Sequence, residues 1–419
     1  PLPFLFRAAD GLGASGKVIA RSYGNVVEAV HTRAGAAYGK VTDGGLFVAP
    51  HSRPRFSVEG TYPALLTEPA VTNYLLRSQE FDNASWSKTN ITATANQATA
   101  PDGTVTADKV AATASAATTL SQTETTISST GVTYSIYGKI GSGASDCNVF
   151  ALRNATTATT LQSHSINWTT GVVTLGTGTN GRSEYYGNGW WRVILWATTG
   201  ITAGDDITVY AGFGGAAETA NEYAYLWGAQ LEPNAFGSSY VPTTTATVAR
   251  VTDLLYFPFT LTPRAMTVYV RQVNRGAFFS TTADDDAVAI SAAGLTEPRL
   301  ALLTTAAGSG RWAASMTNGS TVTSAPTGTT VYGDLTEMRV VLSATGTVLA
   351  GESLNGAAEV TAAESGAPSS GFPTAWSAAR LYVGTPGTFG TPKGGFGFTH
   401  IAVAEGSQTL AAMRDLAEV

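Results

Sequence analysis

The chain has 419 residues, of which 13% are charged and 43% hydrophobic, and its formal net charge is −6. The hydrophobic content excludes a disordered chain, and this length predicts two or three domains. No run of Lys and Arg is present, which excludes a nucleic-acid partner, and no apolar run is long enough for membrane insertion. Many glycines and few charges favour short strands joined by tight turns.

Residues 1–70 are expected to form an N-terminal leader or anchor segment. Strands are predicted at Lys17–Ala20 and Val26–Val30, and a turn precedes another strand at Leu46–Val48. Two arrangements fit this pattern: a separate docking domain, or a strand donated to the domain that follows. We favour an anchoring role.

Residues 71–250 carry strands at regular short spacing. Alternating apolar and polar residues predict strands at Val132–Tyr137, Trp191–Trp196 and Ile207–Phe213, with turns rich in Gly and Asn between them. This pattern is typical of a sandwich or barrel and not of alternating strands and helices.

Residues 251–419 repeat the pattern with different content. Strands are predicted at Met266–Arg271, Arg299–Leu303 and Met338–Leu342, and a short C-terminal helix at 409–419. Asn-Gly pairs at 318–319 and 355–356 indicate hairpin turns. The expected fold class is therefore all-β, with tandem antiparallel jelly-roll or β-sandwich domains and a short C-terminal helix.

Ordered motifs along the first 250 residues resemble a known family. They are His31–Ala34, Pro54–Phe56, Leu65–Ala70, Thr72–Phe81, Ala84–Lys88, Ala100–Thr104, Leu226–Glu232 and Ser238–Thr244. This set resembles phage virion proteins, described as head spike, head fibre or tail fibre proteins, with a carbohydrate-binding-module-like jelly roll. The second half, through Leu381–Gly384, Gly394–Val403 and the 410–416 turn, is similar to a laminin-G or concanavalin-A-like sandwich.

The resemblance implies a structural protein on the virion surface that decorates the capsid or contacts host-surface glycans during host attachment. It implies a homo-oligomer, with a trimer expected, and contacts with other virion proteins through the N-terminal segment. It implies no catalysis. A carbohydrate-binding appendage of a secreted polysaccharide-degrading enzyme is the alternative, and a glycosidase or lyase is a third interpretation.

Residues that could carry chemistry are scattered. His31, His51, His164 and His400 show no metal-binding or catalytic spacing, and Cys147 is a lone cysteine. Glycoside hydrolysis needs paired carboxylates, yet the acidic clusters at 205–206 and 284–286 lie in predicted turns. We therefore expect no catalytic residues and no cofactor. A structural Ca²⁺ at Asp284, Asp285 and Asp286 is a candidate, because Ca²⁺ prefers loop oxygens.

Aromatic residues are the candidates for ligand binding. Sugars stack on exposed rings, and the expected glycan-stacking residues are Tyr185, Tyr186, Trp190, Arg192 and Trp196. Along the strand, Trp191 and Trp190 face opposite sides, so two aromatic-rich faces arise and one of them requires a further covering layer. The competing interpretation assigns these rings to the core or to a subunit interface.

Three charged residues of the leader motifs form a second hypothesis. Arg33, Arg55 and Glu68 either pair as a buried salt bridge that fixes the leader on the jelly roll, or remain exposed.

Overall fold

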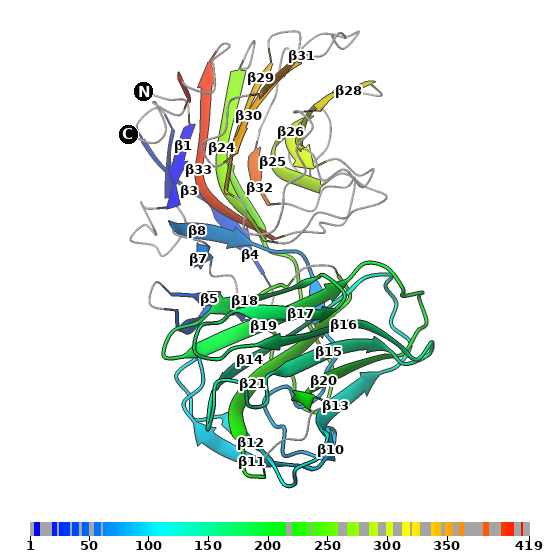
Figure 1. Cartoon of the computed structure of the whole chain (residues 1–419). Coiled ribbons are helices and arrows are strands. Elements are labelled where there is room, and N and C mark those ends of the chain that lie inside the picture. Colours follow the sequence, from blue (N-terminus) through cyan, green and yellow to red (C-terminus); the bar gives the residue numbers. More distant parts are fainter. Residues whose placement is uncertain are drawn as a thin grey trace. The chain divides into compact units, whose positions relative to one another are not determined.

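The structure, a computed structural model, is almost entirely β. It describes residues 4–8, 19–22, 25–33, 36–41, 44–49, 54–59, 62–214, 220–234, 237–258, 266–275, 285–291, 299–304, 312–318, 321–326, 337–344, 348–354, 360–363, 380–384, 395–405 and 412–413. Its strands form antiparallel sheets, which confirms the predicted class of tandem β-sandwich domains (Figure 1). Among these residues, no helix is long and apolar enough to cross a membrane.

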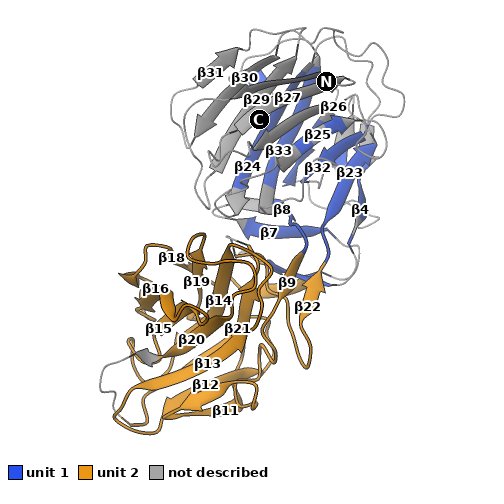
Figure 2. Cartoon of the chain, turned by 90° about the vertical axis from the view of Figure 1, so that its right-hand side faces the viewer, with its two compact units in different colours: residues 1–39, 49–70, 251–419 blue, residues 40–48, 71–250 orange. Residues whose placement is uncertain are grey.

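The chain divides into two compact units (Figure 2). Unit 1 contains residues 1–39, 49–70 and 251–419, and unit 2 contains residues 40–48 and 71–250. The range expected for the first sandwich thus forms the body of unit 2. Most of the expected leader is part of unit 1, because its strands pair with strands from the second half of the chain.

Unit 2 is built on two six-stranded antiparallel sheets. Sheet I has the order β10 (Ser87–Thr89), β13 (Thr118–Glu124), β20 (Ile207–Gly214), β15 (Val149–Asn154), β16 (Thr159–Ile166) and β17 (Val173–Thr177). Sheet II has the order β11 (Ile91–Ala98), β12 (Ala107–Ala112), β21 (Tyr223–Glu232), β14 (Val132–Ile140), β19 (Trp190–Ala197) and β18 (Gly181–Tyr185). A short pair, β9 (Val71–Asn73) with β22 (Val248–Arg250), completes the unit.

Alternation along the strands places the core of unit 2 between these sheets. Tyr134 and Ile136 of β14 and Phe150 and Leu152 of β15 belong to one buried cluster, as period-two side chains on facing strands should. Gly138 continues the inward series of β14. A Cβ there would lie 2.2 Å from Cη2 of Trp168, so only glycine leaves room for this indole.

A bulge in β21 changes which residues face inward. Leu226 and Ala229 both lie in the buried cluster although three positions separate them, and the pairing with β14 shifts register between them. Gly228 stands at this point with a φ of +62°, a conformation that glycine adopts without strain. The bulge directs Trp227 and Gln230 to the outer face of sheet II.

Unit 1 contains a ten-stranded and a seven-stranded sheet. The larger follows the order β3 (Asn25–Glu28), β2 (Ile19–Ser22), β1 (Phe4–Arg7), β33 (Gly395–Glu405), β24 (Met266–Arg275), β29 (Glu337–Ala344), β30 (Val348–Leu354) and β31 (Val360–Ala363), with β8 (Tyr62–Thr67) on β33 and β7 (Arg55–Glu59) on β8. The smaller follows β28 (Thr321–Pro326), β27 (Trp312–Asn318), β26 (Arg299–Thr304), β25 (Asp285–Ser291), β32 (Arg380–Val383), β23 (Leu254–Pro258) and β4 (Val30–Thr32).

Side chains from both sheets of unit 1 meet in a buried layer. Phe6 of the larger sheet and Phe257 of the smaller one have ring centroids 5.9 Å apart, and both are fully buried. Apolar side chains that face each other across two sheets are the basis of a sandwich core. A two-stranded ribbon, β5 (Ala37–Lys40) and β6 (Leu46–Ala49), follows β4 along the chain.

Some predicted elements differ from the structure. The single strand expected at Val26–Val30 is two strands in different sheets, β3 and β4, which separate at the buried Ala29. Asp285 and Asp286 do not lie in a turn but begin β25. Ala412 and Met413 are helical, and the remainder of the helix expected at 409–419 lies outside the described residues.

Candidate functional site

The predicted stacking residues fall into buried and accessible groups. Tyr186, Trp190 and Arg192 are 3%, 1% and 0% exposed, so none of them offers a ring face or a charge to a ligand. Tyr185 is 46% exposed, and Trp196 is half-buried. The structure therefore places four of the five on the strand pair β18 and β19, and Tyr186 directly after β18, but leaves only two of them accessible.

The buried group packs on the outer face of sheet II, where a second aromatic cluster forms. Tyr137 meets the rings of Tyr186 and Trp227 at centroid distances of 4.9 and 5.3 Å. Tyr240 covers this cluster, 4.8 Å from Trp227, and its hydroxyl lies 2.6 Å from Oγ of Ser78. The closing segment of the first motif set thus supplies the covering layer that two aromatic faces require.

Of the accessible group, Tyr185 belongs to a small apolar patch. Its ring centroid lies 4.8 Å from that of Trp191, and the Trp191 indole N–H donates to the carbonyl of Trp168. Val172 and Leu175, next to and on edge strand β17, are 61% and 48% exposed. This region is a candidate contact surface.

A groove lies on the outer face of sheet I. Its volume is about 270 Å³, and it crosses β13, β20, β15 and β16. The described residues that line it are Ala117, Thr118, Thr119, Val149, Ala151, Ser163, Tyr210, Ala211 and Gly212. Small side chains produce the hollow. A Cβ at Gly212 would lie 2.6 Å from the carbonyl oxygen of Thr118, so β20 and β13 come close only because this position is glycine.

Tyr210 is the one aromatic residue of that lining. Its neighbours along β20, Val209 and Ala211, point into the core, so alternation turns the Tyr210 ring outward, where it is half-buried. Its hydroxyl has no hydrogen-bond partner among the described residues, and the same holds for the hydroxyl of Ser163 across the groove. The groove thus combines one ring face with free hydroxyl groups.

The hydroxyl groups of the described lining can bind a polar ligand. This lining holds no carboxylate, imidazole or thiol. Nor do the described residues anywhere gather three or more His, Cys, Asp or Glu side chains into a metal-binding cluster. Cys147 is fully buried in the core of unit 2. Asp284 lies outside the described residues, and the calcium hypothesis stays a prediction.

His164 is buried behind the groove, on the inner face of β16. Its Nδ1 accepts a hydrogen bond from Gly176 N–H at 3.2 Å, so the proton belongs on Nε2, which lies 3.1 Å from Oε1 of Gln162. Burial lowers the pKa of His164. The neutral ring is therefore part of the structural support of sheet I.

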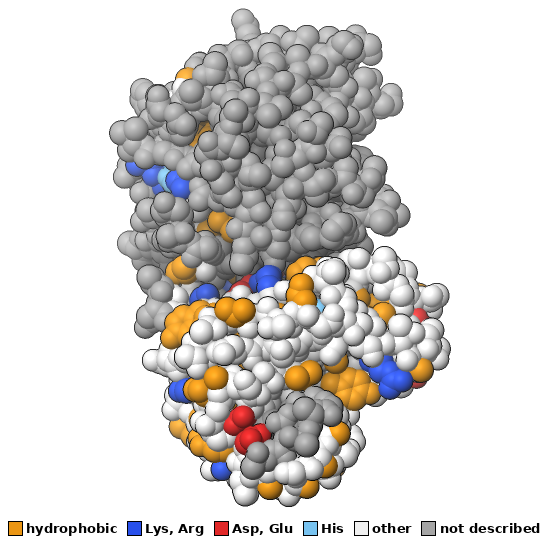
Figure 3. All heavy atoms as spheres, in the orientation of Figure 1, with side chains coloured by type: hydrophobic (Ala, Val, Ile, Leu, Met, Phe, Trp, Pro, Cys, Tyr) orange, Lys and Arg blue, Asp and Glu red, His pale blue; other side chains and the backbone are white. Residues whose placement is uncertain are grey.

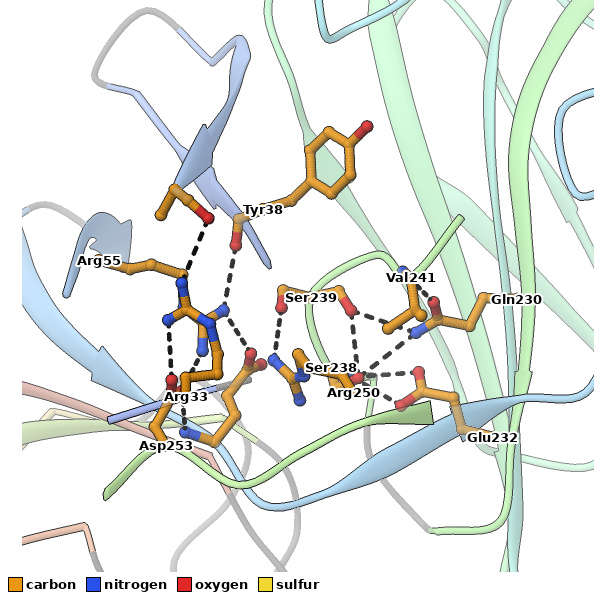
Figure 4. A network of polar contacts seen from close by, with 12 residues as sticks. Arg33, Tyr38, Arg55, Gln230, Glu232, Ser238, Ser239, Val241, Arg250 and Asp253 are labelled. Atoms are coloured by element: carbon orange, nitrogen blue, oxygen red, sulfur yellow. Dashed lines mark hydrogen bonds and ion pairs between the residues drawn. The ribbon is translucent and has the colours of Figure 1, made fainter. Parts of the chain in front are cut away.

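In unit 1 the leader arginines are buried and paired, which confirms that part of the salt-bridge hypothesis (Figure 4). Arg55 Nη1 lies 2.7 Å from Glu68 Oε2, and Arg55 Nη2 contacts Asp253 Oδ2. Arg33 Nη1 lies 2.9 Å from Asp253 Oδ1. Burial alone would lower the pKa of Arg55, but the charges of Asp253 and Glu68 raise it above its usual value.

The hypothesis needs one correction, since these ion pairs join residues of unit 1 and none of the 71–250 jelly roll. The missing partner was Asp253, which no sequence motif singled out. The backbone N–H of Glu68 donates to Asp253 Oδ2 at 3.0 Å, so this one carboxylate joins two arginines and a main-chain group. Such a pairing satisfies charges that would otherwise be very costly to bury.

A separate polar network supports the closing segment of unit 2 (Figure 4). The Glu232 carboxylate accepts from the Ser238 N–H at 3.1 Å, and Gln230 Oε1 accepts from the Val241 N–H at 2.6 Å. Arg250 donates to Ser239 Oγ at 2.7 Å. Burial raises the pKa of Glu232. These contacts hold the segment that carries Tyr240 over the aromatic cluster.

No family model matches the chain, and no curated protein matches it. Among solved structures it is similar to a tandem of two family 22 carbohydrate-binding modules from Paenibacillus barcinonensis, at 11% identity and a TM-score of 0.25, over 81% of this chain and 99% of that one. A truncated protein with a family 32 carbohydrate-binding module and an alginate lyase domain matches at 13% identity and a TM-score of 0.25, over 77% and 99%.

A tail fibre protein of an E. coli phage matches at 8% identity and a TM-score of 0.23, over 81% of this chain and 41% of that one. Likenesses of this size carry no argument about function.

Proposed function

We propose that this chain is a non-enzymatic, glycan-binding structural protein on the surface of a phage particle, and that the Tyr210 groove contacts the glycan. The observation that carries the proposal is the half-buried Tyr210 ring beside the Ser163 hydroxyl, which has no hydrogen-bond partner in the described part of the chain. A sugar presents apolar C–H faces and many hydroxyls, and a pocket of this kind combines an apolar wall with a few polar groups.

Binding without catalysis suits the described lining, which offers no carboxylate, imidazole or thiol. The location on a virion is supported by the ordered motifs between Thr72 and Thr244, which resemble phage spike and fibre proteins. The same groove would serve a carbohydrate-binding appendage of a secreted enzyme. Mass spectrometry of purified particles separates the two, because an appendage would be absent from them.

A homo-oligomer, with a trimer expected, is part of the proposal. In the view of Figure 3 the described surface of unit 2 is mostly uncharged, with charged side chains in small separate groups. Edge strand β17 carries no charged residue and exposes Leu175. Edges without charges invite pairing with another chain. Light scattering that reports a monomer at micromolar concentration would contradict this part of the proposal.

The test of glycan binding is an array experiment with two matched variants. Tyr210→Ala removes the ring of the groove, and Tyr185→Ala removes an accessible ring elsewhere on unit 2. Loss of binding in Tyr210→Ala alone supports the groove. Loss in Tyr185→Ala alone moves the site to the β17–β18 patch, and a chain that binds no glycan contradicts the proposal.

A further inference from the structure

We infer, on the basis of the proposed function, that the Tyr210 groove selects glycans that bear a carboxylate, and that Arg153 pairs with it. Arg153 lies on β15, two residues beyond Ala151 of the groove lining. The expected ligand is a uronic-acid-containing glycan, a class that the lining alone does not specify.

The register of sheet I places Arg153 beside the ring. β15 and β20 pair so that Ala151 is opposite Tyr210 and Arg153 is opposite Thr208. Leu152 points into the core, so Ala151 and Arg153 share the outer face with Tyr210. Arg153 is then the diagonal neighbour of Tyr210 on the adjacent strand, about 7–8 Å away and within reach of a long side chain.

Among the described residues, none neutralises the charge of Arg153. Its Nη2 donates to the carbonyl of Ala158 at 3.2 Å, and no described carboxylate pairs with it. By contrast, Arg77, Arg182 and Arg192 of the same unit each lie within 4.0 Å of a glutamate. Arg153 is partly buried, and the remaining N–H groups of its guanidinium are available to a ligand.

A planar carboxylate fits this arrangement. The guanidinium fork matches the two oxygens of a carboxylate, and charge-assisted hydrogen bonds of this kind are stronger than neutral ones. A uronic acid carries its carboxylate on the ring carbon next to the ring oxygen, so a sugar stacked on Tyr210 could present it toward β15. The described lining has no carboxylate that would repel it. A preference of about tenfold over the neutral sugar is the expected scale for one partly exposed pair.

The experiment measures binding of galacturonate and glucuronate oligosaccharides, each as the free acid and as the methyl ester, by titration calorimetry. The full chain, Arg153→Gln and Arg77→Gln are compared, and thermal unfolding checks that each variant is folded. Arg77→Gln is the matched control, because it removes a partly exposed arginine of unit 2 outside the groove. We expect at least one free acid to bind about tenfold more tightly than its ester, and only Arg153→Gln to abolish the difference.

If the full chain and Arg153→Gln both bind the acid and the ester equally well, the carboxylate inference is overturned, while the proposal of glycan binding stands. The carboxylate inference also fails if neither uronide form binds while neutral array glycans bind in a Tyr210-dependent way. Failure to bind any glycan overturns the proposed function as well.

Discussion

Arg55 and Asp253 lie 198 positions apart in the sequence and form a buried ion pair in unit 1. Asp253 also pairs with Arg33, and Glu68 pairs with Arg55, so two cations face two anions where water is excluded. Removing one partner of such a set leaves an uncompensated charge, which is far more costly than removing an exposed pair.

Asp253→Asn is therefore expected to lower the free energy of unfolding by about 3–5 kcal/mol, because the buried Arg33 and Arg55 both lose the negative charge of Asp253. Urea denaturation measures it. The control is Arg77→Gln, which removes a partly exposed pair with Glu80 and should cost at most about 1 kcal/mol. An Asp253→Asn effect no larger than that of the control would show that the cluster contributes little.

Stability of unit 2 should fall as the solution is acidified, through His164. Burial lowers the folded-state pKa of His164 below its usual 6.5, so the unfolded chain takes up the proton first. The stabilisation that the neutral His164 ring contributes to the folded state is present above pH 6.5, and it is lost as the pH falls toward the folded-state pKa. The difference in unfolding free energy between the wild-type chain and His164→Gln should shrink from pH 7.5 to about 5. Parallel pH profiles for the two proteins would contradict this.

Trp190→Ala and Tyr185→Ala should separate a core residue from a surface residue. Trp190 is 1% exposed and donates its indole N–H to the carbonyl of Thr99. Its truncation should cost about 3–5 kcal/mol. Tyr185→Ala, at an exposed ring, should change stability by about 0.5 kcal/mol or less. Chemical denaturation followed by circular dichroism measures both, and similar losses would disprove the assignment.

Gly138→Ala should be destabilising although alanine suits a strand at least as well as glycine. The added methyl group would meet the Trp168 indole, and overpacking of this kind costs about 1–3 kcal/mol. Trp168→Phe in the same chain makes room, so the double variant should lose less than the sum of the single losses. Additive losses would exclude a direct clash.

Alternation along single strands was enough to predict much of unit 2. Val132–Tyr137, Trp191–Trp196 and Ile207–Phe213 all lie within observed strands, β14, β19 and β20. Their patterns also predicted that the two faces of β19 would both need cover. The sequence did not reveal which segment supplies it, because Tyr240 lies far along the chain from Tyr137 and Tyr186.

Elsewhere, pairing between strands far apart in the sequence limited what could be predicted. The destination of the leader depends on contacts such as Phe4 with Val403, which no local pattern encodes. Tyr210 lay within a predicted strand. Its accessibility depends on two small residues, Ala151 on the neighbouring strand β15 and Gly212 on β20, the strand of Tyr210 itself. Among the buried charges, Asp253 was missed because a single aspartate after a strand pair resembles an ordinary turn residue.

The pairing of β1 with β33 has a consequence for the order of events during synthesis. Phe4–Arg7 leaves the ribosome long before its partners at 400–403, which lie far along the chain. All strands of unit 2, from β9 to β22, emerge in between. Unit 2 can thus complete its sheets while β1 has β2 on one side and its other edge still lacks β33. A chain terminated before residue 395 would leave that strand edge open to other nascent chains.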